Sequence, residues 1–169
     1  MSIPSGEEEV LGVVLLRRPR SLGRWDTFAT VLTTRRMIFA QITGEMVKEA
    51  TEQAKRQAKA EGKGFLGQWS AQLRATLSYA NRYMSMEPSL ILSETPGNFY
   101  IDNDSIGEIK LKLSPQGNVN EFDVEIHSRS GKMVFKMDEN ADNVRLLKNA
   151  YGDRVKLPFG YSISGFRLG

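Results

Sequence analysis

The pattern of side chains changes abruptly at Thr43–Gly44 and changes back at Pro88. Before and after these points, apolar residues occur in short runs or alternate with polar ones, as they do in β-strands. Residues 45–61 are rich in Ala, Glu, Gln and Lys, which are strong helix formers, and Thr43 is placed to cap a helix. The sequence therefore predicts an α+β fold in which a helical block interrupts a β-rich domain.

The block 45–87 is expected to form an inserted helical hairpin. Gly62–Lys63–Gly64 breaks the first helix, and apolar residues then recur every three or four positions. This stripe predicts a second helix whose apolar face packs on the barrel, on the first helix or on a second copy of the chain. The residues of this candidate self-association face are Leu66, Trp69, Leu73 and Leu77.

The flanking regions predict strands and one further helix. A β-hairpin is expected to turn near Thr33–Arg35, and a C-terminal helix over 139–151 is expected to begin at Asp138 or Asn140 and to end at Gly152. We expect one domain over 1–157, interrupted by the insertion at 45–87, and an unassigned tail over 158–169. The expected strands cover residues 9–16, 25–34, 37–42, 90–92, 99–101, 109–113, 122–127 and 133–137.

Charge is concentrated near the N-terminal end of the chain. The net charge is only +3, but residues 17–36 hold six arginines and a single aspartate. Such a cluster attracts anionic partners. Lipid headgroups, nucleic acid and acidic protein surfaces all carry the negative charge that it needs. The charge alone does not indicate which of these three is the partner.

The composition argues against catalysis and cofactor binding. Without cysteine and with His127 as the sole histidine, there is little material for a zinc site or a catalytic triad. The Gly-x-Gly-x-x-Gly match at 62–67 follows a charged helical stretch rather than the buried strand that a dinucleotide site needs. We therefore expect no enzyme activity, no cofactor and no metal.

The chain also lacks a strongly apolar segment of membrane-spanning length. Its longest apolar run, Val10–Leu16, is far shorter than the roughly 20 residues that cross a bilayer. The first nine residues are acidic, unlike a secretory signal. A cytoplasmic protein, with any membrane attachment peripheral, is the expectation.

Three segments together resemble bacterial-type pleckstrin-homology-like (PH-like) and GRAM-like domains. They are Val31–Phe39, with a strand-turn-strand pattern around Thr33-Thr34-Arg35-Arg36, the stretch Phe99–Lys112, and the hairpin Asp123–Met137 with its following helix. The resemblance implies a strongly bent, partly open antiparallel β-barrel of about seven strands, closed at one end by the C-terminal helix. The helical insertion departs from that pattern.

The resemblance also implies a location for a binding site. PH domains that bind phosphoinositides use basic residues on the first strand and its following loop, where this chain has Arg17, Arg18, Arg20 and Arg24. We expect a non-catalytic module that engages a protein partner or anionic lipid headgroups through these arginines. The alternative is nucleic-acid binding through the same residues, with Trp25 stacking on a base.

Overall fold

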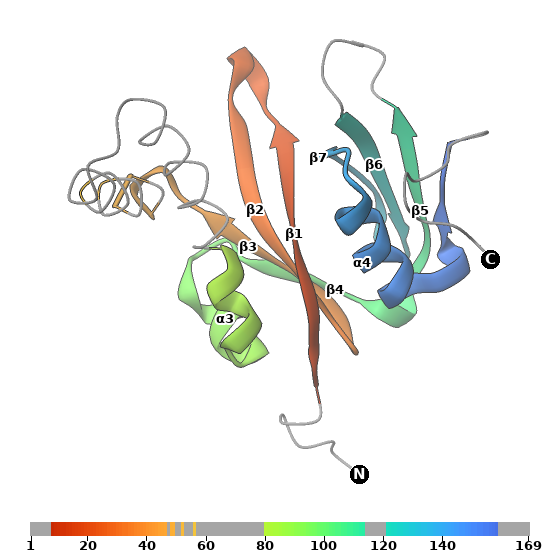
Figure 1. Ribbon diagram of the computed structural model, residues 1–169, viewed down its shortest axis with the longest axis horizontal. Helices are drawn as coiled ribbons and strands as arrows, with labels where there is room; N and C mark the ends of the chain where they lie inside the picture. Colours follow the sequence, from red (N-terminus) through yellow and green to blue (C-terminus); the bar gives the residue numbers. More distant parts are fainter. Residues whose placement is uncertain are drawn as a thin grey trace.

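The computed structural model describes residues 8–46, 48, 49, 52, 56, 80–113 and 121–158. These residues form an α+β fold built on one sheet of eight strands (Figure 1). The strands are β1 (Val10–Pro19), β2 (Trp25–Thr33), β3 (Arg36–Ile42), β4 (Phe99–Asp102), β5 (Ile106–Leu113), β6 (Glu121–Ser128), β7 (Gly131–Asp138) and β8 (Val155–Lys156). The helices are α3 (Pro88–Glu94), α4 (Ala141–Tyr151) and the 3₁₀ turns η2 (Ser21–Gly23), η3 (Arg82–Ser85), η4 (Asn103–Ser105) and η5 (Gly152–Arg154).

The sheet is mixed and open, with strand order β4-β3-β2-β1-β7-β6-β5-β8. Within the described residues it does not close, because β4 and β8 lie at its two edges. Strands β1–β7 pair antiparallel, as expected for about seven antiparallel strands, whereas β8 is an additional eighth strand that runs parallel to β5 and makes the sheet mixed. Gly152, at φ 57°, and η5 redirect the chain after α4 and bring the buried Val155 to the edge of β5.

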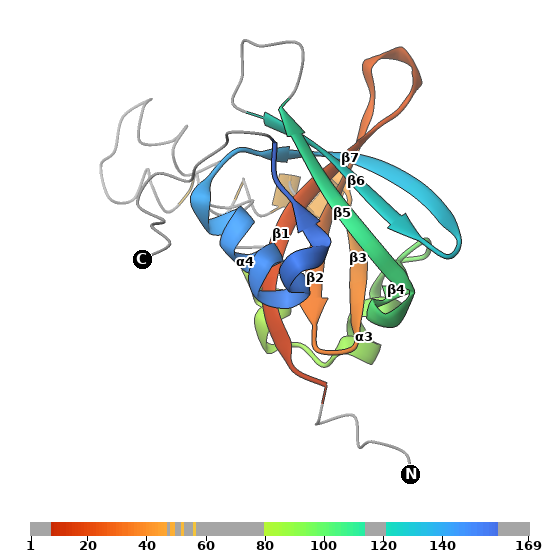
Figure 2. The ribbon, with the colours of Figure 1, turned by 90° about the vertical axis from the view of Figure 1, so that its right-hand side faces the viewer.

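One core lies between the bent sheet and α4, which covers one end of it (Figure 2). Alternate residues of β6 are buried, as expected for strands with one apolar face. The rings of Phe28, Phe39, Phe99 and Phe135 meet in stacked and edge-on contacts at centroid distances of 4.5–6.2 Å. Asn140 caps α4 as the sequence predicted, because its side chain accepts a hydrogen bond from the Asn143 amide at 2.8 Å.

A second core lies on the opposite face of β1–β3, beneath η3 at the end of the insertion and α3 after it. Val31 and Ile38 pack there with Tyr83 and Ile91, all of them fully buried. Strands β2 and β3 are therefore buried on both faces, which explains their nearly unbroken runs of buried residues.

The prediction of a strand at 90–92 was wrong, because these residues belong to α3. Pro88 occupies the first turn of that helix, where its missing amide donor costs nothing and its fixed φ fits. Ile91 is buried while Leu90 is 58% exposed, which is a helical rather than a strand pattern. Three consecutive apolar residues are too few to distinguish the two periods.

The described part of the insertion supports its helical character at both ends. The Met46 amide donates to Thr43 Oγ1 at 3.2 Å, so Thr43 caps a helix as predicted. Residues 44–46, 48, 49, 52 and 56 are helical, as are Ala80 and Asn81. The stripe Leu66, Trp69, Leu73 and Leu77 lies outside the described residues, as does the tail from 159, so the hairpin and its self-association stay predictions.

Candidate functional site

The hairpin formed by β1 and β2 extends beyond the rest of the sheet (Figures 1 and 2). Strand β1 pairs with β7 only at Arg17, opposite Lys136, and beyond that point it pairs with β2 alone. All residues from Pro19 to Trp25 are exposed. The arginines that sequence analysis singled out are therefore carried on a projecting finger, with Arg17 and Arg18 still inside β1.

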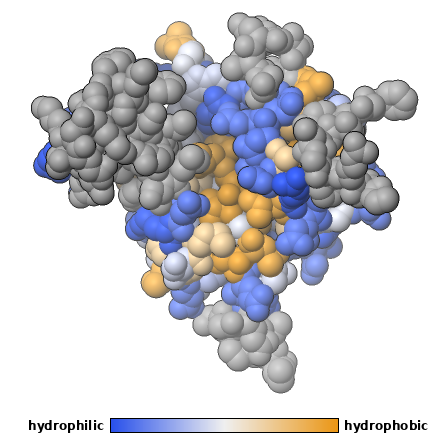
Figure 3. Space-filling view, viewed as in Figure 1, coloured by the Kyte–Doolittle hydropathy of each residue, from blue (hydrophilic) through white to orange (hydrophobic). Residues whose placement is uncertain are grey.

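The apex of the hairpin is a tight turn. The Arg20 amide donates to the Arg24 carbonyl at 2.7 Å, and η2 lies between them. Leu22 occupies the left-handed region, at φ 61° and ψ 36°, and is 91% exposed. In the space-filling view an apolar group marks the far end of the hairpin (Figure 3).

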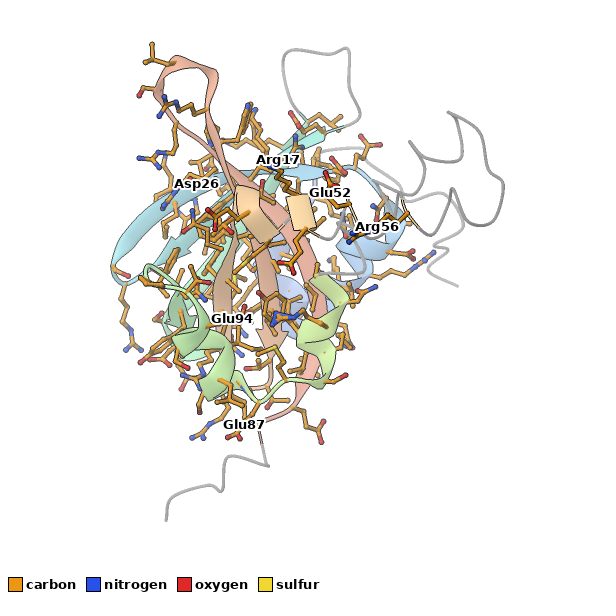
Figure 4. The ribbon with its side chains drawn as sticks, turned by 90° about the vertical axis from the view of Figure 1, so that its left-hand side faces the viewer. Arg17, Asp26, Glu52, Arg56, Glu87 and Glu94 are labelled. Carbon is orange, nitrogen blue, oxygen red and sulfur yellow. The ribbon has the colours of Figure 1, made fainter. Side chains whose placement is uncertain are left out.

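Arg17 and Arg18 are engaged with the protein itself. The Arg17 guanidinium contacts Glu121 at 2.5 Å and Asp138 at 3.2 Å. Arg18 lies 3.7 Å from Asp26, and its guanidinium covers the ring of Phe28 at 5.3 Å. Figure 4 shows Arg17 and Asp26 where the hairpin leaves the body of the protein. These two arginines tie the base of the hairpin to β6, β7 and the aromatic core.

Arg20 and Arg24 are much freer. The Arg20 side chain is 61% exposed and reaches Asp26 at 3.3 Å, a carboxylate that it shares with Arg18. Arg24 is exposed, and its side chain has no hydrogen bond or ion pair within the part of the chain that the structure describes. Because exposed ion pairs are worth only about 0–1 kcal/mol, an external anion can compete with Asp26 for Arg20, and at Arg24 no carboxylate of the described ranges competes with it.

Two of the six clustered arginines lie at the opposite end of β2. Arg35 lies in the β2–β3 turn and Arg36 begins β3, and both line an open depression of about 780 Å³ together with Arg129. Glu8, Asp102 and Asp104 line the same depression, so its formal charges cancel. Arg36 donates to both oxygens of Glu8, at 2.9 and 3.1 Å, and lies over Tyr100. This end of the sheet is thus less suited to binding an anion than the hairpin.

The described residues offer little else for chemistry. Among them, no group of three or more histidine or acidic side chains is arranged to hold a metal ion. His127 contacts Glu125 on the outer surface of β6, at 3.3 Å. No helix within the described ranges has both the length and the apolar character needed to cross a bilayer.

Sequence reasoning assigned no binding role to the side chain at the apex. Leu22 stands alone between Ser21 and Gly23, outside any helical or strand periodicity, so the hydrophobic pattern does not single it out. The available signal was local: a single large apolar residue in a turn flanked by Arg20 and Arg24. Trp25 was considered only for base stacking, and the structure places it beside the apex, 47% exposed, with Arg17 over its ring at 5.6 Å.

Comparisons of the chain with protein-family models, with curated proteins and with solved structures find no match.

Proposed function

We propose that this protein is a non-catalytic binding module of PH-like architecture that uses the end of the β1–β2 hairpin to engage an anionic surface. The proposal depends on the exposure of Arg20 and Arg24 at the projecting end of the hairpin, where Arg20 shares Asp26 with Arg18 and Arg24 has no ion pair among the described residues. The surface is formed by anionic lipid headgroups or by an acidic protein.

The fold is consistent with the PH-like part of this proposal. Strands β1–β4 follow one another as neighbours, β5–β7 do the same, and the two groups meet where β1 pairs with β7. Helix α4 follows the last of these strands and contributes Val144, Leu147 and Tyr151 to the core. A bent sheet with such a helix is what the resemblance of the sequence implies, although β8 and the inserted block are additions to it.

The electrostatics favour transient, salt-sensitive binding. A basic residue near an anionic membrane contributes about 1 kcal/mol, and this contribution decays over a Debye length of about 10 Å at 0.1 M salt. Arg17 contacts two carboxylates, and Arg18 and Arg20 share Asp26, so Arg24 and the 61% exposed Arg20 are expected to contribute most of the attraction. Two such residues give weak attachment, which multiple copies or a second contact would strengthen.

The test is flotation with phosphatidylcholine vesicles that either contain or lack phosphatidylglycerol, at low and high salt. The wild type is compared with the double variant Arg20→Gln/Arg24→Gln, which removes both exposed charges and leaves the ion pairs of Arg17 in place. We expect the wild type to float only with anionic vesicles at low salt. The variant should bind roughly thirtyfold more weakly, since two basic residues contribute about 2 kcal/mol.

The matched control is Arg35→Gln/Arg129→Gln, which removes the same number of exposed charges at the other end of the sheet. Equal losses in the two double variants would show that net charge, and not the hairpin, drives binding. Absence of flotation at low salt would reject lipid as the surface and leave an acidic protein. A gel shift with single-stranded RNA, lost in the hairpin variant alone, would favour the nucleic-acid alternative.

A further inference from the structure

The apex of the hairpin carries a hydroxyl group in a strongly basic setting. Ser21 begins η2 and is exposed, and its hydroxyl makes no hydrogen bond within the described residues. Arginines stand four, three and one residues before it, and another stands three residues after it. Kinases select their substrates by such charge patterns, and those with acidic substrate clefts recognise a serine that follows arginines. Ser21 therefore has the surroundings of a phosphorylation site.

Leu22, directly after Ser21, fits the same recognition. Its side chain is 91% exposed, more than any other large apolar side chain in the described part of the chain. Its backbone has a φ of 61°, which glycine or asparagine adopts more readily than leucine does. An exposed leucine here improves neither core packing nor backbone geometry. In a kinase cleft, an apolar residue after the acceptor serine gains a partner, because it removes apolar surface from water.

The end of the hairpin can open without disturbing the rest of the fold. Beyond Arg17, β1 pairs with β2 alone, so extending the chain around Ser21 breaks only the last β1–β2 pairs and the backbone hydrogen bond that closes the turn. A two-stranded ribbon is only marginally stable by itself. The same opening releases Arg18, three residues before Ser21, from Asp26, which it contacts at 3.7 Å. Ser21 can thus enter a cleft that binds an extended chain.

A second serine shows how the fold selects between similar sequences. Ser85 is also exposed, with an arginine three residues before it and an apolar residue after it. The guanidinium of that arginine, Arg82, is paired with Glu94, and the intervening Tyr83 is fully buried in the second core. Extending the chain around Ser85 would pull Tyr83 out of that core. Of these two serines, Ser21 is the one that a kinase can reach.

We propose that Ser21 is the acceptor of a basophilic serine kinase, and that its phosphate switches off the anion-binding end of the hairpin. The Ser21 Oγ attacks the terminal phosphorus of a nucleoside triphosphate. The Oγ–P bond forms, the bond from that phosphorus to the oxygen of the nucleoside diphosphate breaks, and the hydroxyl proton passes to a base of the kinase. This inference rests on the proposed function, because it regulates the same site.

The phosphate would act on the two arginines that the proposed function uses. Phosphoserine carries about −1.5 to −2 charges near neutral pH, which is comparable in size to the summed positive charge of Arg20 and Arg24. The Arg20 amide and the Arg24 carbonyl are joined by a hydrogen bond at 2.7 Å, so Ser21 lies close to both residues. Arginine and phosphate form strong, charge-assisted hydrogen bonds. The phosphorylated apex is therefore nearly neutral and no longer attracts an anionic surface.

The first test asks whether the folded protein is modified at Ser21. The purified protein is incubated with ATP, Mg²⁺ and a kinase selective for arginine three residues before the serine, and the phosphate is located by peptide mass spectrometry. We expect Ser21 to be modified in the wild type and in the matched control Ser85→Ala, and the signal to be lost in Ser21→Ala. A proline-directed kinase should leave Ser21 unmodified, because leucine follows it. If the basophilic kinase does not modify Ser21, the inference is wrong.

The second test measures the switch by flotation with vesicles that contain phosphatidylglycerol, at low salt. The phosphorylated wild type is expected to bind roughly thirtyfold more weakly than the unmodified protein, because the contributions of two basic residues are lost. Ser21→Ala, carried through the same kinase reaction, should bind as the untreated wild type does, which controls for phosphate at other positions. Treatment of the phosphorylated protein with a phosphatase should restore binding.

The outcomes separate the inference from the proposed function. Modification of Ser21 together with loss of vesicle binding supports the inference. Modification without loss of binding would show that the phosphate is not a switch, so the inference would be wrong while the proposed function stands. Failure of the unmodified protein to bind anionic vesicles would reject both the lipid surface and the switch measured on it. Mass spectrometry decides whether Ser21 is an acceptor without any vesicles, so the two failures are distinguishable.

Discussion

The two ends of β2 both carry arginines, but they use them in different ways. At the β2–β3 turn, Arg36 is largely buried and holds Glu8 with two hydrogen bonds. At the β1–β2 turn, Arg20 and Arg24 extend into solvent. The ends of a strand of nine residues lie about 26 Å apart. A cluster of arginines in sequence is therefore not one electropositive surface, because carboxylates from other segments neutralise some of its charges and leave others available.

The largest expected difference between the two ends is in stability. Arg36→Ala should lower the free energy of unfolding by about 3 kcal/mol, because it leaves the Glu8 carboxylate, whose side chain is 6% exposed, without its cationic partner. Arg24→Ala should change it by less than about 0.5 kcal/mol. Urea unfolding followed by circular dichroism measures both. Similar losses in the two variants would contradict the distinction drawn between the two ends.

A somewhat smaller effect is expected at Asn103, which fixes the β2–β3 turn to the rest of the fold. Its side chain donates to the Thr33 carbonyl at 3.0 Å and accepts from the Tyr151 hydroxyl at 2.7 Å. Asn103→Ala should cost about 2 kcal/mol, because it leaves partly buried polar groups without their partners. The control is Asn149→Ala, at an exposed asparagine of α4, which should be neutral within error. Asn98 would not serve as a control, because its side chain also hydrogen-bonds to backbone groups.

Two threonines of β2 sharpen the comparison within a single strand. Both Thr30 and Thr33 are fully buried, but the Thr30 hydroxyl has no hydrogen-bond partner among the residues that the structure describes. Thr33 accepts from the Arg35 and Arg36 amides at 3.1 and 2.9 Å. Valine has nearly the same shape as threonine, so Thr30→Val should stabilise the protein by about 1 kcal/mol and Thr33→Val should destabilise it by at least about 1 kcal/mol. Changes of the same sign in thermal unfolding would refute this reasoning.

The smallest effect is expected from a surface ion pair between β5 and β6, outside both groups of arginines. The Lys112 ammonium donates to Glu125 at 2.8 Å and, together with His127, holds the pKa of that carboxyl below its usual value of 4.5. A lowered pKa in the folded state means that the stabilisation is present above pH 4.5 and is lost as the pH falls through the lowered value. Urea unfolding between neutral and acidic pH should therefore show a slightly shallower acid dependence in Glu125→Gln. If Glu125→Gln has the same pH profile as the wild type, the Lys112–Glu125 pair contributes nothing measurable to the free energy of unfolding.

Much of the β-sheet was predictable because its signals are local. The turn between β2 and β3, the alternation of β5 and β6, and the Asn140 cap of α4 each depend on neighbours in sequence. The strand expected at 90–92 failed because a short apolar run fits a helix equally well once Pro88 begins it. Strand β8 was missed because two residues carry no period, and only their pairing with Ile109 and Lys110 defines them.

The candidate site likewise has features that are visible in the sequence and features that arise only from the fold. The arginine-rich segment, the lack of cysteine and the α+β pattern can be read from the sequence, since composition and periodicity are properties of the chain. Which arginines remain available for a partner depends on the three-dimensional fold. Glu121 and Asp138 reach Arg17 from positions more than a hundred residues away, whereas the turn that exposes Leu22, Arg20 and Arg24 projects beyond every other strand. Charge neutralisation depends on distances in space, and no local pattern encodes them.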